Sequence, residues 1–318
     1  MVTAKNPILS GFYPDPSICR VGEDYYLVTS SFVYAPGVPI FHSRDLAHWE
    51  QIGNILDRPS QLCVENEEIS RGIFAPTIRY HEGTFYMITT NVSHGGNFIV
   101  TAQDPAGPWS DPYYLGEEAV GIDPSLFFDD DGRVYVFSGT GSLKELKGDL
   151  SDVKPDGVDM KIFERDETET GLLEGSRVIK HNGKYYLLMI SWPRGENRRQ
   201  VCYRADKITG PYEKKVILED KFEGFPYVGQ GCIVDDEKGN WYGMIFQDRG
   251  GIGRVATLMP CRWIDGWPIL GDENGKVPQV MEKPVQGYPE KSLVVSDDFS
   301  DSTLKLNWQW NHNPVNEA

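Results

Sequence analysis

The amino-acid sequence predicts an all-β protein, and more specifically a five-bladed β-propeller. A Gly followed by an aromatic-rich apolar run recurs five times along the chain, at Gly22, Gly83, Gly132, Gly183 and Gly239. Turn residues accompany each of these Gly residues, which is the pattern of a β-hairpin. Long helical patterns are missing from the sequence, which argues against an α/β barrel or a doubly wound sheet.

The spacing of the hairpins indicates the size of each repeat. The five Gly residues lie about 50 residues apart, a length that fits a propeller blade of four strands. A further short strand, a polar turn and a Trp or Tyr follow the hairpin in three repeats, at residues 43–50, 101–112 and 203–214. We therefore predict that residues 1–294 form the propeller domain and that residues 295–318 form a C-terminal extension.

The composition narrows the class of partner. The chain has 318 residues, 40% of them hydrophobic, and a formal net charge of −16. Nucleic acids and anionic membranes attract basic surfaces, so this charge argues against both as partners. A neutral ligand such as a small oligosaccharide carries no such penalty. The oligomeric state is left open by the sequence.

The N-terminal segment and the cysteines indicate the compartment. No run of 18 apolar residues is present, and residues 1–11 lack the apolar segment of a signal peptide. We expect a cytoplasmic protein, or a secreted one if a leader has been removed. The five cysteines are widely spaced, which fits neither a disulfide framework nor a zinc site. Cys202, Cys232 and Cys261 lie in apolar runs and are predicted to be core residues.

The innermost strand of each predicted blade begins with a residue at a matching position. Each of these residues precedes its hairpin Gly by seven to nine positions, and the five are Asp15, Ala75, Asp123, Glu174 and Gln230. Inner strands line the central channel of a propeller. We therefore expect these five side chains, which we call the rim residues, to surround one mouth of the channel.

Three of the five rim residues are acids, and three explanations are open. Asp15 and Asp123 both precede a Pro, where Asp often caps a turn. Clustered carboxylates also suit calcium or magnesium. However, acids in one cleft repel each other and separate in pKa, which is what acid–base catalysis at neutral pH requires. Turn capping does not predict acids at matching positions in three of five repeats, so we favour an acid–base site.

Other candidates lie near the rim positions in sequence. Phe32 follows the first hairpin strand and Phe74 directly precedes Ala75. Aromatic rings pack on the apolar faces of sugars, so both are predicted to line a sugar site. Arg254 lies among glycines after the fifth hairpin strand and is predicted to bind hydroxyl or carboxylate groups. Asp248 and His94 are weaker candidates, the latter in a surface loop.

Motifs throughout the predicted propeller resemble those of glycoside hydrolase family 43, whose members trim xylan and arabinan. The motifs are NPILSGFYPDPSI (6–18), FHSRDLAHWEQIG (41–53), GIFAPTIRYHEGTFY (72–86), GIDPSLFFDDDGRVY (121–135), LLEGSRVIKHNGKYYLL (172–188), FQDRGGIGRVATLMP (246–260) and WIDGWP (263–268). Within the family the pattern is similar to β-xylosidases and α-L-arabinofuranosidases. The C-terminal segment from Ser296 resembles the start of the β-sandwich domain found in many relatives.

The resemblance implies a role for each matching residue. Asp15 corresponds to the general base, Glu174 to the general acid, and Asp123 to the residue that orients the acid and raises its pKa. Arg254 corresponds to the arginine that holds hydroxyls of the terminal sugar. Phe32 and Phe74 match positions that line the subsite of that sugar. The rim residues Ala75 and Gln230 are also predicted to bind substrate. The implied activity is exo-acting hydrolysis with inversion, which releases a terminal pentose.

One departure from the family concerns metal binding. Many members have a histidine at the rim of the last blade, close to a central calcium ion, where this chain has Gly229 and Gln230. We expect the reaction to require no cofactor, and a structural or activating calcium ion near Gln230 is left as an open alternative.

Alternatives to this function are also open. They are a sugar-binding propeller without catalysis, a calcium-structured binding module, an arabinan-degrading member of the family, and a retaining fructosidase of related fold. Carboxyl separation distinguishes the retaining from the inverting reaction, with about 5–5.5 Å expected for the first and about 6.5–9.5 Å for the second.

Overall fold

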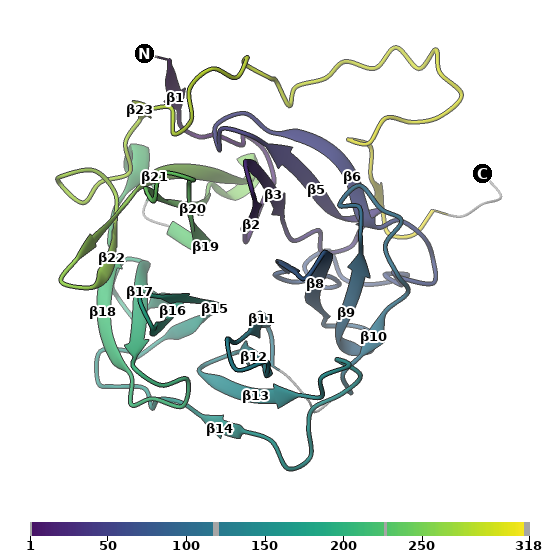
Figure 1. The fold of residues 1–318 in the computed structure, drawn as a ribbon. Helices are drawn as coiled ribbons and strands as arrows, with labels where there is room; N and C mark the ends of the chain where they lie inside the picture. Colours follow the sequence, from purple (N-terminus) through teal and green to yellow (C-terminus); the bar gives the residue numbers. More distant parts are fainter. Residues whose placement is uncertain (1, 117–120, 226–227, 315–318) are drawn as a thin grey trace.

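The computed structural model describes residues 2–116, 121–225 and 228–314. Their main feature is a ring of five four-stranded antiparallel sheets around a central channel (Figure 1), so the predicted five-bladed propeller is confirmed. None of the helices in these residues has the length and apolar character needed to cross a lipid bilayer.

Each blade is a four-stranded antiparallel meander whose strands are paired in chain order. Blade 1 contains β2 (Ser17–Val21), β3 (Asp24–Val28), β5 (Gly37–Ser43) and β6 (Glu50–Leu56). Blade 2 contains β7 (Thr77–His81), β8 (Thr84–Asn91), β9 (Gly96–Ala102) and β10 (Tyr113–Tyr114). Blade 3 contains β11 (Ser125–Phe128), β12 (Val134–Ser138), β13 (Ser142–Leu146) and β14 (Asp159–Lys161).

Blades 4 and 5 have longer inner strands. Blade 4 contains β15 (Leu172–His181), β16 (Lys184–Trp192), β17 (Arg199–Ala205) and β18 (Glu213–Leu218). Blade 5 contains β19 (Val228–Asp235), β20 (Trp241–Asp248), β21 (Arg254–Ile264) and β22 (Trp267–Leu270). Short 3₁₀ helices, η1 (Phe222–Gly224) and η2 (Gly250–Ile252), lie before and within blade 5.

The recurring Gly residues form the turns between the first two strands of each blade. All five have positive φ, between 60° and 83°. This left-handed conformation costs a residue with a Cβ about 1–2 kcal/mol, so the turn explains why Gly recurs at the same place in each repeat.

The apolar core consists of five clusters in the described residues, one between each pair of neighbouring blades. Strands are therefore covered on both faces. On β8, for example, Met87 packs between blades 1 and 2, whereas Ile88 packs between blades 2 and 3. Burial on both faces explains why many of these strands are continuous apolar runs rather than alternating ones. As predicted, Cys202, Cys232 and Cys261 are buried free thiols.

The ring closes between blades 5 and 1. The segment before β2 runs beside β21, where Leu9 and Ala256 exchange backbone hydrogen bonds and the Tyr13 N–H donates to the Arg254 carbonyl at 2.9 Å. Preceding it, β1 (Thr3–Lys5) pairs with β23 (Val280–Glu282), at the upper left of Figure 1.

After β23 the chain crosses the outside of blade 1. This C-terminal segment is the yellow trace along the top and right of Figure 1. Its strand β24 (Trp310–Asn311) forms a separate two-stranded sheet with β4 (Tyr34–Ala35), which lies in the connection between β3 and β5. The domain boundary at residue 294 stays a prediction.

Candidate active site

The rim residues of blades 1, 2 and 3 precede the inner strand in the same way. Asp15, Ala75 and Asp123 each lie two residues before the first residue of β2, β7 and β11. Asp15 and Asp123 have nearly the same left-handed backbone conformation, with φ of 57° and 56°. Asp tolerates this conformation better than most residues, and strained backbone of this kind clusters at functional sites.

The rim residues of blades 4 and 5 lie inside their inner strands. Pairing of β15 with β16 shifts register between Glu174 and Arg177, and pairing of β19 with β20 shifts between Val228 and Gly231. Such bulges redirect side chains and are common beside active sites. The bulge in β15 thus gives Glu174 its place at the rim, although the residue belongs to a regular strand.

Asp15 is a buried carboxylate surrounded by groups that favour its ionised form. Its Oδ2 accepts a hydrogen bond of 2.5 Å from the Ser30 hydroxyl. Burial raises the pKa of Asp15, and the guanidinium groups of Arg254, Arg177 and Arg198 act against that rise. These three positive charges and the Ser30 hydroxyl all favour the charged carboxylate, but burial has the larger effect, so the pKa of Asp15 lies above its usual value.

Asp123 and Glu174 are close enough to oppose each other's ionisation. Burial raises the pKa of Asp123 to about 8, and the carboxyl groups of Glu174 and Asp15 add to the rise. Burial and the Asp15 charge also raise the pKa of Glu174. The Asp123 carboxylate accepts a 3.0 Å hydrogen bond from the Gly175 N–H, so it also fixes the backbone beside Glu174. The Glu174 charge thus makes Asp123 harder to ionise, and acids that interact in this way titrate as a pair.

Aromatic rings form a wall beside these acids. The rings of Phe32 and Phe74 are 5.4 Å apart, and Phe12 lies 5.7 Å from Phe32. The Arg254 guanidinium lies 5.5 Å from the centroid of Phe32, where the charge meets the negative face of the ring. Phe32 has φ of 50°, an unfavourable conformation for a bulky residue, and it is held there by a two-way backbone pairing with Ile73.

The structure gives the weaker candidates different surroundings. Asp248 forms an ion pair with Arg254, with Oδ2 and Nε 3.6 Å apart, so it orients the arginine. His94 pairs with Glu67 on an exposed loop. Ala75 and Gln230 are buried, at 1% and 4% exposure, which leaves little surface for a sugar. Their predicted part in substrate binding stays untested.

Sequence reasoning missed several residues near the acids. Arg198 and Arg165 both lower the pKa of Glu174, and Arg198 lies 4.4 Å from the ring centroid of Trp192. Both arginines belong to irregular segments without a repeat position, so the repeats gave no signal for them. Phe12 was also missed, although its place in the GFYPDP motif, three residues before Asp15, could have indicated it.

The residues around Gln230 do not fit a calcium ion. In the orientation that satisfies both side chains, the Gln230 amide oxygen accepts from Nη1 and Nη2 of Arg177, at 2.9 and 3.0 Å. A calcium ion needs six to eight oxygen ligands, and here a guanidinium takes the oxygen instead. Among the described residues, no three His, Cys, Asp or Glu side chains are grouped to hold a metal.

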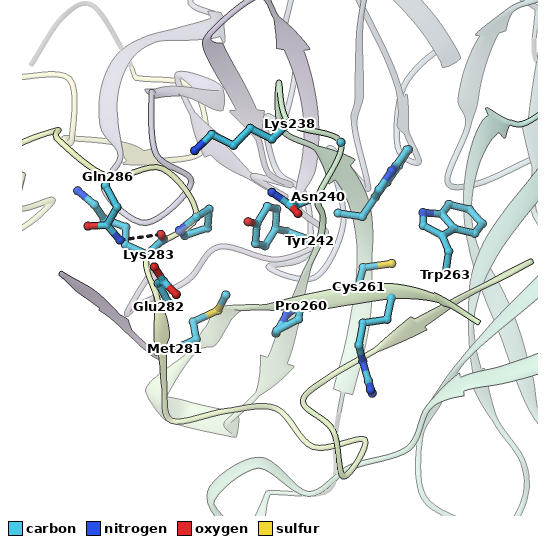
Figure 2. Close-up of a pocket in the computed structure, with 14 residues that line it drawn as sticks. Lys238, Asn240, Tyr242, Pro260, Cys261, Trp263, Met281, Glu282, Lys283 and Gln286 are labelled. Atoms are coloured by element: carbon cyan, nitrogen blue, oxygen red, sulfur yellow. Dashed lines mark hydrogen bonds between the residues drawn. The ribbon is translucent and has the colours of Figure 1, made fainter. Parts of the chain in front are cut away.

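A separate cavity of about 680 Å³ lies at the other end of blade 5. Figure 2 shows that it opens between the start of β20, with Asn240 and Tyr242, and the segment around Glu282. The hairpin turn that borders it lies at the end of β19 opposite Gln230. None of the three rim acids lines it, so this cavity is distinct from the candidate active site.

The fold and the rim together define a propeller protein with three coupled carboxyl groups at one channel mouth, an arrangement suited to acid–base chemistry. Residues 4–268 match the sequence profile of the family described as "Glycosyl hydrolases family 43". The chain belongs to that family, and the resemblance inferred from the motifs is confirmed.

Individual relatives agree with this assignment. A protein of Butyrivibrio fibrisolvens named xylosidase/arabinosidase is 47% identical, with 96% of this chain and 64% of that protein covered. A non-reducing-end α-L-arabinofuranosidase of Bacteroides ovatus is 36% identical, with 98% and 62% covered. A crystal structure of a family 43 protein from Bacillus licheniformis has a TM-score of 0.89 at 33% identity, with 100% and 66% covered. The chain thus spans less than two thirds of the length of these two curated relatives.

Proposed function

We propose that this chain carries the catalytic site of an exo-acting, inverting glycoside hydrolase that releases terminal pentoses from xylo-oligosaccharides and arabinoxylan fragments. The observation that carries the proposal is the set of three buried, mutually interacting carboxyl groups at the channel mouth, beside an aromatic wall with an arginine. The names of relatives as xylosidases and arabinosidases support pentosides as substrates.

The proposed reaction assigns one proton transfer to each of two acids. Glu174 donates its proton to the glycosidic oxygen as the bond from that oxygen to the anomeric carbon breaks. A water molecule attacks the opposite face of the sugar, and Asp15 takes up the proton that this water releases. We assign the base to Asp15 because three arginines act against the rise of its pKa, and the acid to Glu174 because burial and the Asp15 charge raise its pKa.

Substrate binding follows from the groups around the acids. The rings of Phe12, Phe32 and Phe74 offer apolar surface to the carbon–hydrogen face of a pentose. Arg254, held by Asp248, donates hydrogen bonds to its hydroxyl groups. β-D-Xylose and α-L-arabinofuranose present similar hydroxyl groups, so we propose both as substrates.

The test is hydrolysis of nitrophenyl β-D-xyloside and nitrophenyl α-L-arabinofuranoside side by side, with the first-formed anomer followed by proton NMR. We expect turnover of at least one substrate, with inversion. Asp15→Ala should lower kcat by about 10²–10⁴-fold, the usual contribution of a general base. Product of retained configuration, or near-normal turnover by Asp15→Ala, would contradict the proposed mechanism. Sugar binding without turnover would instead indicate a non-catalytic binding propeller.

A further inference from the structure

Arg177 is the most deeply buried charged group beside the candidate site, with 1% of its surface exposed. It follows Glu174 by three residues on β15, the inner strand of blade 4. Its Nη2 donates to the backbone carbonyls of Asp15 at 3.2 Å and Pro76 at 3.0 Å. Its Nη1 donates to the Ser176 carbonyl at 3.0 Å. The side chain therefore reaches from blade 4 to the inner-strand entrances of blades 1 and 2.

Blade 5 adds a further contact to this guanidinium, whose Nε is buried without a hydrogen-bond partner. The Gln230 amide oxygen accepts from both Nη atoms, at 2.9 and 3.0 Å. Three backbone carbonyls and one amide oxygen from four blades thus converge on a single positive group. Carbonyl and amide oxygens are also the ligands of hard metal cations. Here they are already occupied by a cation that belongs to the chain.

Arg79 provides a useful comparison elsewhere in the channel. It donates to the carbonyls of Leu126, Ile78 and Val178, and to the Ser125 hydroxyl, so it joins blades 2, 3 and 4. Burial, followed by the Arg177 charge, lowers the pKa of Arg79 to about 10. Among the described residues, the hydrogen bonds of Arg79 go to blades 2, 3 and 4, so it is a buried channel arginine that does not hold the proposed base.

We propose that Arg177 is the internal cation of the central channel, which joins four blades at the active-site mouth and positions Asp15, so that this protein needs no metal ion there. The positioning of Asp15 rests on the proposed function, whereas the joining of the blades does not. Arg177 is a positioning residue, because it acts on the reaction through the backbone and charge of Asp15.

Two effects connect Arg177 to Asp15. The hydrogen bond to the Asp15 carbonyl fixes a residue whose left-handed backbone would otherwise relax. The positive charge favours the ionised carboxylate, together with other groups that face it. Groups facing Asp15 are Ser30, Arg254, Arg177, Arg198, Asp123 and Glu174. Groups facing Arg177 are Asp123, Cys232, Asp15 and Arg79.

The first test uses the unmodified protein and does not depend on activity. The melting temperature and calorimetric calcium binding are measured after treatment with EDTA and again with millimolar calcium chloride. We expect the same melting temperature in both conditions and no heat of binding, because the converging oxygens already hold Arg177. A melting temperature that rises with calcium would overturn the proposal, since a ligand of the folded state stabilises it.

The second test compares Arg177→Met with the matched control Arg79→Met. Both should lower the melting temperature, because both remove a buried hydrogen-bonding group. Only Arg177→Met should lower kcat, by roughly 10- to 100-fold, and move the acidic limb of the kcat/KM profile to higher pH. Loss of a nearby positive charge raises the pKa of Asp15, so the base is protonated at a higher pH than before. An acidic limb in Arg177→Met that coincides with that of the unmodified protein would overturn the positioning role.

Arg177→Lys keeps the test decisive if Arg177→Met does not fold. Lysine retains the charge but cannot make the same paired contacts with four blades. We expect the acidic limb to stay in place while kcat and the melting temperature fall. Unchanged kcat and melting temperature in Arg177→Lys would contradict the proposal. If the unmodified protein hydrolyses neither pentoside, the proposed function fails, and the calcium measurement still tests the internal cation.

Discussion

At the scale of single residues, the site separates acids of similar intrinsic strength by their surroundings. Asp15 has a hydroxyl donor and arginines, whereas Asp123 has mainly burial and two other carboxyl groups. Glu174 is less buried than either aspartate and has one more methylene with which to reach a glycosidic oxygen. These differences support a base, an acid and a third carboxyl group that controls the acid.

The role of Glu174 can be tested through the leaving group. A dinitrophenolate leaves without protonation, whereas a sugar alkoxide requires a proton. We therefore expect Glu174→Gln to lose about 10²–10⁴-fold in kcat/KM on xylobiose and far less on a dinitrophenyl xyloside. The comparison of kcat/KM for the two substrates serves as its own control. Equal losses on both would make Glu174 a residue that positions the substrate, and Asp248 would be the next candidate for the acid.

The role of Asp123 can be tested through the pH profile. The Glu174 charge raises the pKa of Asp123, and because repulsion between two carboxylates is mutual, a charged Asp123 opposes ionisation of Glu174. Asp123→Asn removes that charge with little change in shape, so Glu174 should lose its proton at lower pH. We expect the alkaline limb of kcat/KM to move to lower pH. A limb that does not move would indicate that Asp123 acts only through its hydrogen bond to the Gly175 N–H.

At the scale of elements, short irregular segments before the inner strands determine the shape of the site. The segment before β7 pairs with Phe32 through Ile73, in both directions, and so holds Phe32 against Phe74. Gly72 begins this segment with φ of 84°, and a Cβ there would lie 2.4 Å from the Phe32 carbonyl oxygen. The close approach of two backbones, as well as the left-handed conformation, requires Gly at this position.

Gly72→Ala and Gly83→Ala form a matched pair for this element. Gly83 has φ of 83°, nearly the same as Gly72, but a Cβ there would meet nothing within 4 Å. Gly83→Ala should cost about 1–2 kcal/mol of stability, the penalty of the left-handed conformation alone. Gly72→Ala should cost more and also raise KM, because the clash displaces Phe32. Urea unfolding measures the loss of stability, and steady-state kinetics measure KM. Equal effects of the two substitutions would contradict the claim that Gly72 holds Phe32 in place by allowing the two backbones to approach closely.

The elements also show which features could be predicted from the sequence. Hairpin turns are local in sequence, so Gly22 and its four equivalents indicated where each blade lies. They also showed that Asp15, Asp123 and Glu174 occupy matching positions in their repeats. The bulge at Glu174 and the placement of Arg177 depend on strands from other blades, and no local pattern specifies them. Arg198 likewise reaches the acids only after folding. Repeats therefore predict what each blade contributes, but not what fills the channel where the blades meet.

At the scale of the whole molecule, stability depends on how the ring is closed. The first strand of blade 1 and that of blade 5 are far apart in the chain, yet β2 packs against β19. Arg20 and Asp235 form a two-bond ion pair across this junction, at 2.9 and 3.0 Å, with both side chains partly exposed. Exposed pairs of this kind contribute about 0.2–1 kcal/mol, so the pair is a minor part of the closure.

Asn6 stabilises the closed ring more than this ion pair does, because it is buried and forms hydrogen bonds with three backbone groups. Its amide donates to the carbonyls of Leu258 at 2.6 Å and Pro278 at 2.8 Å, and its oxygen accepts from the Leu258 N–H at 2.8 Å. Asn6→Ala would leave these buried groups without hydrogen-bond partners. Each group that stays buried would then lower the free energy of unfolding by about 1–3 kcal/mol.

We expect Asn6→Ala to lower the free energy of unfolding by about 2–4 kcal/mol and Arg20→Met by about 1 kcal/mol or less. Both are measured by urea unfolding. Hydrogen exchange at Leu9 and Ala256 should accelerate in Asn6→Ala, because the segment that Asn6 anchors pairs with β21 through these two residues. The same segment reaches Arg254 through Tyr13, so loosening it should also raise KM. If Arg20→Met destabilised the protein more than Asn6→Ala, the ion pair between the inner strands, rather than the N-terminal segment, would be what holds the ring closed.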